Sequence, residues 1–191
     1  MRYLQLAAFL LIVITVSSVF CEEKKEYQQP DNFMGVEFGS SKSKLVEVLA
    51  EEGIEHKVND TLDLVYGRGI TLGKKKVGIT FSFFKDKLVG FLIEGYRNDS
   101  LHFYRTLAQC NDFAQYFKSL YGVWSEFSNP SFKEIRPNTI AYSHKWSFKD
   151  YRVFVGIIGT DSYTVPVAGI MDENLWRKRY EQIMNRQKEK D

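Results

Sequence analysis

The chain has 191 residues, of which 44% are hydrophobic and 26% charged, close to the average of globular proteins. This composition excludes a disordered or fibrous chain. Its 26 basic and 24 acidic residues give a net charge of +2, too small a surplus to indicate a protein that binds nucleic acid. Aromatic residues make up 15% of the chain, which favours a β-rich core.

The N-terminus has the features of an export signal. Met1 and Arg2 supply a positive start, and the apolar run Leu4–Phe20 ends at Cys21, beyond which a densely charged segment begins. This order is typical of a secretory signal peptide, so residues 1–21 are predicted to be one. An uncleaved membrane anchor is the alternative, because the run is at the lower limit of the length that spans a bilayer. We expect an exported protein, located in the periplasm or cell envelope or secreted.

Cys21 has two interpretations. It matches the cysteine of a bacterial lipoprotein signal, which would attach the protein to a membrane, but Phe20 is larger than the residue that usually precedes such a cysteine. Ordinary cleavage after Ser18 or after Cys21 itself is the other interpretation. The polar segment 22–31, which contains Pro30, is predicted to be a flexible tether in either case. If Cys21 is lipidated or removed, one cysteine remains and no intramolecular disulfide can form.

Residues 32–187 are predicted to form a single α+β domain. The spacing of apolar residues and the Gly, Asn and Asp turns predict, in chain order, a strand 33–38, a helix 42–52, strands 62–72, 77–84 and 88–96, a helix 101–121, strands 139–148, 151–158 and 163–170, and a helix 173–186. Strand runs joined by hairpins indicate an antiparallel sheet with the helices packed on one face. Pro166 has no backbone N–H to donate, so its strand is expected at an edge of the sheet.

Two segments of the sequence resemble each other. Ser82–Gly90 (SFFKDKLVG) and Ser147–Gly156 (SFKDYRVFVG) both span a turn between two strands that follow a predicted helix. The similarity predicts a sheet built from two helix-plus-three-strand units. It also favours an internal duplication that relates residues 33–97 to residues 100–171.

The segment Phe33–Ser41 (FMGVEFGSS), followed by an amphipathic helix, resembles the opening of many exported bacterial envelope proteins. Tyr121-Gly122, with Trp146 and a strand pair after a polar gap, is similar too. The layout is similar to that of the beta-lactamase inhibitor protein and of small outer-membrane assembly lipoproteins. This resemblance implies small helix-plus-sheet modules, most of them non-enzymatic or of unknown role. It assigns no functional residue, because the shared positions are structural ones.

The sequence contains no motif that indicates a particular reaction. His56, His102 and His144 lie in different predicted elements without metal-ligand spacing, so we expect neither a metal site nor a cofactor. Cys110 lies on the apolar stripe of helix 101–121, which favours a buried packing thiol over a nucleophile. Gly67-Arg68-Gly69 is too short to hold a phosphate and is interpreted as a bend. No catalytic residue is predicted.

One strand carries candidate ligand-binding residues. The period of two places Tyr142, His144 and Trp146 on one face of strand 139–148, as an aromatic platform with a titratable centre. The alternative is that these residues belong to the core of the sheet.

We therefore expect a non-catalytic exported or envelope-associated protein. Its partner would be another envelope or extracellular protein, or a small apolar ligand, and not nucleic acid. The alternative is an exported hydrolase whose active site is scattered in the sequence. His144 with Tyr142, or Cys110 with a histidine, would then be the first residues to consider.

Overall fold

The computed structural model of the chain describes residues 27–72, 75–137, 139–159 and 162–188. The predicted signal peptide and Cys21 lie outside these residues. The described elements are β1 (Asn32–Phe33), β2 (Val36–Glu37), α2 (Lys42–Glu51), β3 (Glu55–Asn59), β4 (Leu64–Leu72), β5 (Lys75–Phe84), β6 (Lys87–Glu94), β7 (Asn98–Asp99), the 3-10 turn η1 (Ser100–His102), α3 (Phe103–Tyr121), β8 (Glu126–Phe127), the 3-10 turn η2 (Phe132–Glu134), β9 (Ala141–Ser147), β10 (Tyr151–Gly159), β11 (Tyr163–Asp172) and α4 (Glu173–Lys188).

The predicted α+β class is confirmed, and the large sheet is antiparallel. Its strands follow the order β3-β4-β5-β6-β11-β10-β9-β8, with β7 paired to the end of β11. Each half of the sheet therefore consists of strands that are consecutive in the chain, and the last strand of each half, β6 or β11, lies at the centre. Each half contains one strand more than predicted. The additional strands are β3, which is charged, and β8, which has two residues; neither has the apolar alternation by which a strand is predicted from sequence.

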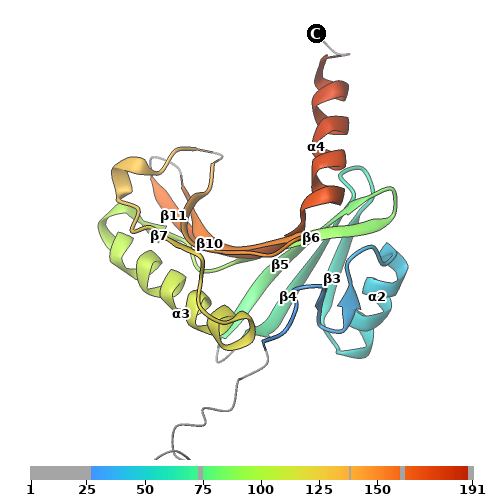
Figure 1. The fold of residues 1–191 in the computed structure, drawn as a ribbon, viewed down its shortest axis with the longest axis horizontal. Coiled ribbons are helices and arrows are strands. Elements are labelled where there is room, and N and C mark those ends of the chain that lie inside the picture. The colour runs from blue at the N-terminus through green and yellow to red at the C-terminus, as the bar shows by residue number, and fades with distance from the viewer. Residues whose placement is uncertain (1–26, 73–74, 138, 160–161, 189–191) are drawn as a thin grey trace, which may run out of the picture.

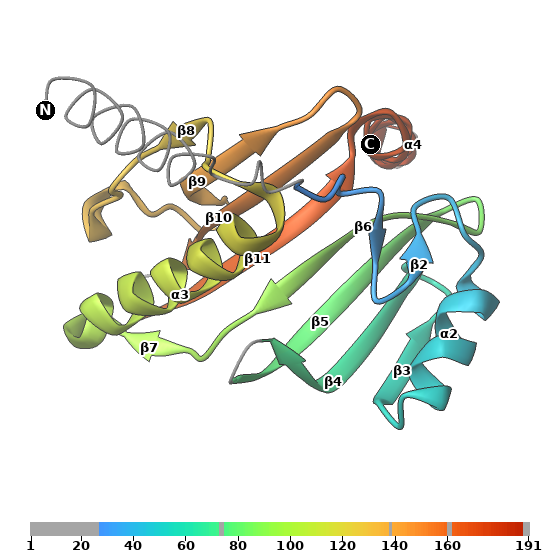
Figure 2. The same ribbon diagram turned by 60° about the horizontal axis from the view of Figure 1, so that its bottom comes forward.

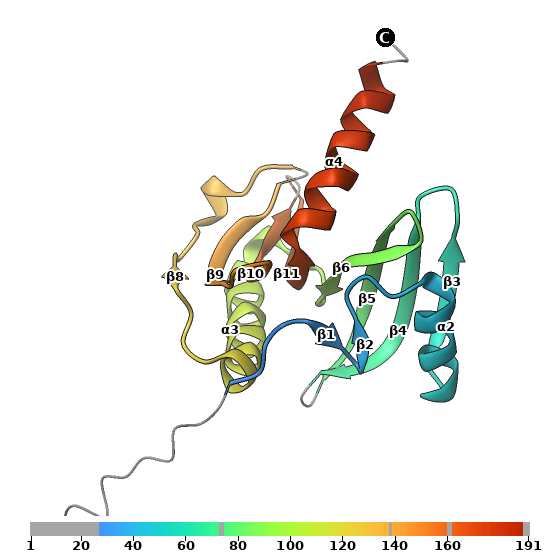
Figure 3. The same ribbon diagram turned by 45° about the vertical axis from the view of Figure 1, so that its right-hand side comes forward.

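One face of the sheet is covered by α2, α3 and the β1–β2 hairpin, and Figure 3 shows the hairpin between the two helices. α3 buries a stripe at helical spacing that includes Cys110, Phe113 and Phe117 against β9, β10 and β11. The hairpin inserts Phe33, whose ring centroid is 4.0 Å from that of Phe91 on β6. Apolar side chains from both halves of the sheet therefore form one continuous core.

α4 departs from the expected arrangement of the helices. It leaves the end of β11 and projects away from α2 and α3 (Figure 1), and Figure 2 shows it nearly along its axis. Asp172 caps its first turn by accepting hydrogen bonds from the amides of Asn174 and Leu175, both at 2.9 Å. Arg152 on β10 forms an ion pair with Glu173 at 2.8 Å. The base of α4 is thus fixed to the sheet, while the large side chains Trp176 and Tyr180 stay exposed.

The expectation that β11 is an edge strand is wrong, because β11 lies between β6 and β10. In an antiparallel strand, the N–H and C=O groups of one residue point to the same neighbour. The carbonyl of Pro166 accepts a hydrogen bond from the amide of Gly95, on the side of β11 that faces β6. The position of the N–H that Pro166 lacks is therefore on the β6 side as well. There β6 has already ended at Glu94, and pairing with β11 resumes only at Asn98. The proline is tolerated because it lies at a gap in the ladder.

The described part of the predicted tether, residues 27–31, lies against the domain. The amide of Gln28 donates a hydrogen bond of 2.9 Å to the carbonyl of Leu120, at the end of α3. The ring of Tyr27 lies beside Gly122, and Pro30 is buried. These contacts fix the point at which the chain enters the domain.

Candidate functional site

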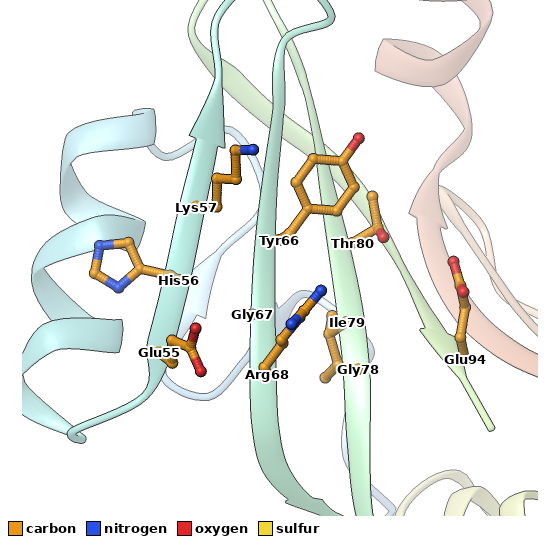
Figure 4. A pocket seen from close by; sticks show the side chains of 10 residues that line it. All are labelled: Glu55, His56, Lys57, Tyr66, Gly67, Arg68, Gly78, Ile79, Thr80 and Glu94. Atoms are coloured by element: carbon orange, nitrogen blue, oxygen red, sulfur yellow. The ribbon is translucent and has the colours of Figure 1, made fainter. Parts of the chain in front are cut away.

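The side of the sheet opposite α2 contains a hollow of about 490 Å³ over strands β3 to β6. Strand alternation decides which residues face it, since Val65, Ile79 and Ile93 point into the core and their neighbours point out. Figure 4 shows the outward side chains along the hollow, with His56 turned to the other side. These outward residues are Glu55, Lys57, Tyr66, Arg68, Thr80 and Glu94.

The pairing register explains why a hollow forms here. Glu55 pairs with Arg68, Arg68 with Gly78 and Gly78 with Glu94, so one row crosses four strands. In that row Gly78 has no side chain, and a Cβ atom built on it would have only a backbone oxygen within 4 Å, at 4.0 Å. The missing side chain leaves a depression between the guanidinium of Arg68 and the carboxylate of Glu94. In the next row Tyr66 lies between Lys57 and Thr80.

A second, smaller cleft of about 320 Å³ lies in the angle between α4 and the sheet. Met171 and Arg152 line it from β11 and β10, and Trp176, Arg177 and Tyr180 line it from α4. Arg152 is already paired with Glu173. This cleft adds an aromatic and cationic surface at the base of α4.

The expectation that Tyr142, His144 and Trp146 share one face is wrong. Along β10, Val155 pairs with His144 but Gly156 pairs with Tyr142, so Ser143 is an extra residue. Such a β-bulge shifts the alternation by one residue and sends the side chains before and after it to opposite faces. Tyr142 packs edge-on against Phe154 at 5.6 Å on the side away from α3. A joint ligand-binding role for the three residues stays a prediction.

His144 lies inside the core, with 3% of its surface exposed. Its ring packs edge-on against Trp124, with centroids 4.6 Å apart, and lies 5.0 Å from that of Phe127. Its Nδ1 atom is 3.0 Å from the hydroxyl of Ser143, and no described carboxylate lies within hydrogen-bonding distance of the ring. Burial lowers the pKa of His144 below its ordinary value of 6.5. The imidazole is therefore a neutral core group with no acidic partner among the described residues.

Trp146 and Cys110, the other candidate residues, also make contacts of the kind found in a protein core. Trp146 donates from its ring nitrogen to the carbonyl of Gly122 at 2.8 Å and packs edge-on against Phe117. Cys110 is buried, and its thiol donates to the carbonyl of Gly156. Burial raises the pKa of Cys110 to about 12, so the reactive thiolate is scarce at neutral pH. These contacts are those of a packing thiol, as the stripe of α3 predicts.

The two remaining histidines lie apart from each other. Nδ1 of His56 is 3.1 Å from the carbonyl of Ile54, and Nδ1 of His102 is 2.7 Å from the carboxylate of Asp99. Within the described ranges, no group of three or more His, Cys, Asp or Glu side chains is arranged to hold a metal ion.

Sequence reasoning missed the hollow itself. Gly67-Arg68-Gly69 was interpreted as a bend, and Gly69 does adopt a left-handed conformation (φ 77°) at a bulge in β4. Arg68 and Tyr66, however, point outward beside it. The available signal was the polar face of strand 77–84, where Thr80 and Ser82 alternate with apolar residues. A polar face opposite a buried one indicates a sheet with one uncovered side.

Comparison of the chain with protein-family models, curated proteins and solved structures found no match. The resemblance to small exported envelope proteins therefore stays a prediction.

Proposed function

We propose that this protein is a non-catalytic exported or envelope-associated protein that binds another protein through the hollow on β3 to β6. The uncovered row of Arg68, Gly78 and Glu94, with Tyr66 beside it, carries this proposal. Tyr and Arg are enriched among the residues that contribute most to protein–protein binding. The depression at Gly78 accepts a side chain of the partner, and the charges on both sides orient it.

The chemistry of the hollow favours a protein over a small apolar ligand. Its exposed lining includes the charged groups of Glu55, Lys57, Arg68 and Glu94, and a wholly apolar molecule would desolvate these without replacing their hydrogen bonds. A protein surface offers amides and side chains of both charges. The buried environments of His144 and Cys110 lend no support to the hydrolase alternative.

Site-specific photo-cross-linking in native cells tests the binding face. A benzophenone amino acid at Tyr66, in the hollow, should capture a defined partner, whereas the same probe at Tyr104 should not. Tyr104 is the matched control because it is an exposed tyrosine on α3, which covers the other face. Capture of the same proteins from both positions, or from neither, would contradict the proposal.

Export is supported by the sequence of residues 1–21. Within the part of the chain that the structure describes, no helix is long and apolar enough to cross a membrane. We expect the intact mass of native protein to correspond to a chain that starts between Val19 and Lys24. A diacylglycerol mass on Cys21 would identify membrane attachment through that residue. An unprocessed chain starting at Met1 in the cytosol would contradict export.

A further inference from the structure

A groove of about 430 Å³ lies on the face of the sheet that carries the helices, and it is separate from the binding face proposed above. Its walls come from the β1–β2 hairpin, the end of α2, β4 and the last turn of α3. Phe33, Ile54, Ile70 and Leu120 supply the apolar part of its lining. Polar groups, among them those of Gln28, Asn32 and Thr71, supply the rest. A volume of this size is within the range of sites for small molecules.

Tyr121 gives the groove a buried polar group. Only 8% of its surface is exposed, and its ring packs between Phe117 and Phe148, with centroids 5.8 and 6.0 Å away. Its hydroxyl has no hydrogen-bond partner among the described residues. No fully enclosed polar side-chain atom in these residues lacks a partner, so the hydroxyl is accessible to solvent, and Tyr121 is one of the residues that line the groove. Burial raises the pKa of Tyr121, and the nearby Tyr116 and Asp31 add to this effect. The phenol therefore stays protonated and is available as a donor.

The charges around the groove select against an anion. Asp31 acts on Tyr121, and Glu52 lines the groove. Among the described residues, the lining contains no lysine or arginine that could neutralise a carboxylate or a phosphate. A lining of apolar side chains and uncharged polar groups, with acidic neighbours and the two tyrosines Tyr116 and Tyr121, suits a neutral molecule that accepts a hydrogen bond.

We propose that this groove binds an uncharged amphipathic molecule, whose apolar body packs on Phe33, Ile70 and Leu120 and whose ester or hydroxyl oxygen accepts a hydrogen bond from Tyr121. This site is independent of the protein-binding face, so either proposal can fail without the other.

The test measures binding of 1-monodecanoylglycerol to the full chain by NMR titration below its micelle concentration, with sodium decanoate as the charged comparison. We expect saturable binding of the neutral probe with shifts confined to residues around the groove, and at least tenfold weaker binding of decanoate. Tyr121→Phe should weaken binding of the neutral probe about fivefold, which corresponds to one neutral hydrogen bond of ~1 kcal/mol. Tyr104→Phe, on the exposed side of the same helix, should leave it unchanged.

A second variant blocks the groove from its rim. Gln28 is an exposed residue that lines the groove beside Leu120, so Gln28→Trp should fill the space without entering the core. We expect it to abolish binding while the melting temperature stays within a few degrees of that of the wild type. Absence of saturable binding to the full chain overturns the proposal, including the case in which the chain's own N-terminal segment fills the groove. Equal binding by Tyr121→Phe and wild type, or tighter binding of decanoate, also overturns it.

Discussion

The guanidinium of Arg179 on α4 donates a hydrogen bond of 2.6 Å to the backbone carbonyl of Phe83 at the end of β5. The same side chain reaches the carbonyls of Leu62 and Asp63, at 3.0 and 3.5 Å, in the turn between β3 and β4. Asp63 in turn pairs with Lys42 at the start of α2. One arginine thus connects the projecting helix to the half of the sheet that holds the hollow.

Replacing this arginine should loosen α4. We expect Arg179→Met to lower the free energy of unfolding by about 1–3 kcal/mol, because charge-assisted hydrogen bonds to half-buried carbonyls are lost. Urea unfolding measures the loss, and amide exchange in α4 should become faster. Lys178→Met is the matched control, since Lys178 is exposed on the same turn. Equal effects of the two substitutions would show that Arg179 does not fix the helix.

The packing of α3 predicts a large effect for a charge placed in the core. Phe117 is completely buried and contacts Tyr121 and Trp146. We expect Phe117→Asp to destabilise the protein by several kcal/mol, enough to unfold it, because the carboxylate cannot be solvated there. Ala108→Asp, on the exposed side of α3, should cost less than about 1 kcal/mol through helix propensity alone. Similar melting temperatures for the two variants would mean that α3 is not packed as described.

The buried His144 should make stability depend on pH. Burial lowers its pKa in the folded state below the unfolded value of 6.5, so the unfolded chain binds more protons as the medium is acidified. The contribution of the neutral ring is complete above pH 6.5 and decreases as the pH falls through that value. We therefore expect the stability lost between pH 7.5 and pH 5 to be smaller in His144→Gln than in wild type, as measured by urea unfolding. An identical loss in both proteins would exclude a depressed pKa.

The hollow can be closed without strain at its floor. A Cβ atom at Gly78 meets no close neighbour, and an aromatic residue suits a strand better than glycine. We expect Gly78→Tyr to keep or slightly raise the melting temperature and to abolish the cross-link formed from Tyr66. Glu47→Tyr, on the exposed surface of α2, should leave that cross-link intact. A cross-link that survives Gly78→Tyr would place the partner elsewhere.

Local periodicity was sufficient to predict most of the elements. The positions of Cys110, Ala114, Phe117 and Tyr121 recur at helical spacing, and α3 buries all four. The alternation around Ile79 and Phe81 likewise predicted a strand with one buried face. Such patterns can be recognised in the sequence because each depends on residues only a few positions apart.

The pairing of the strands with one another could not be predicted in the same way. Pro166 suggested an edge, but β11 is central, and it tolerates the proline because the ladder on that side is interrupted where β6 ends. Tyr142 and His144 have even spacing, but the extra residue Ser143 in the pairing with β10 sends them to opposite faces. In both cases the pairing with the neighbouring strand decides the outcome, and the spacing of residues within one strand does not reveal that pairing.

By itself the sequence determined the helices, the main strands, the α+β class and the burial of the apolar stripe of α3, because apolar periodicity and turn residues act locally. Only the tertiary structure placed Arg68, Gly78 and Glu94 in one row and made Tyr121 part of the wall of a groove. These residues come from separate segments, and the register of strand pairing and the docking of the hairpin bring them together. The energy that fixes that register is the burial of the shared core, which depends on all segments at once.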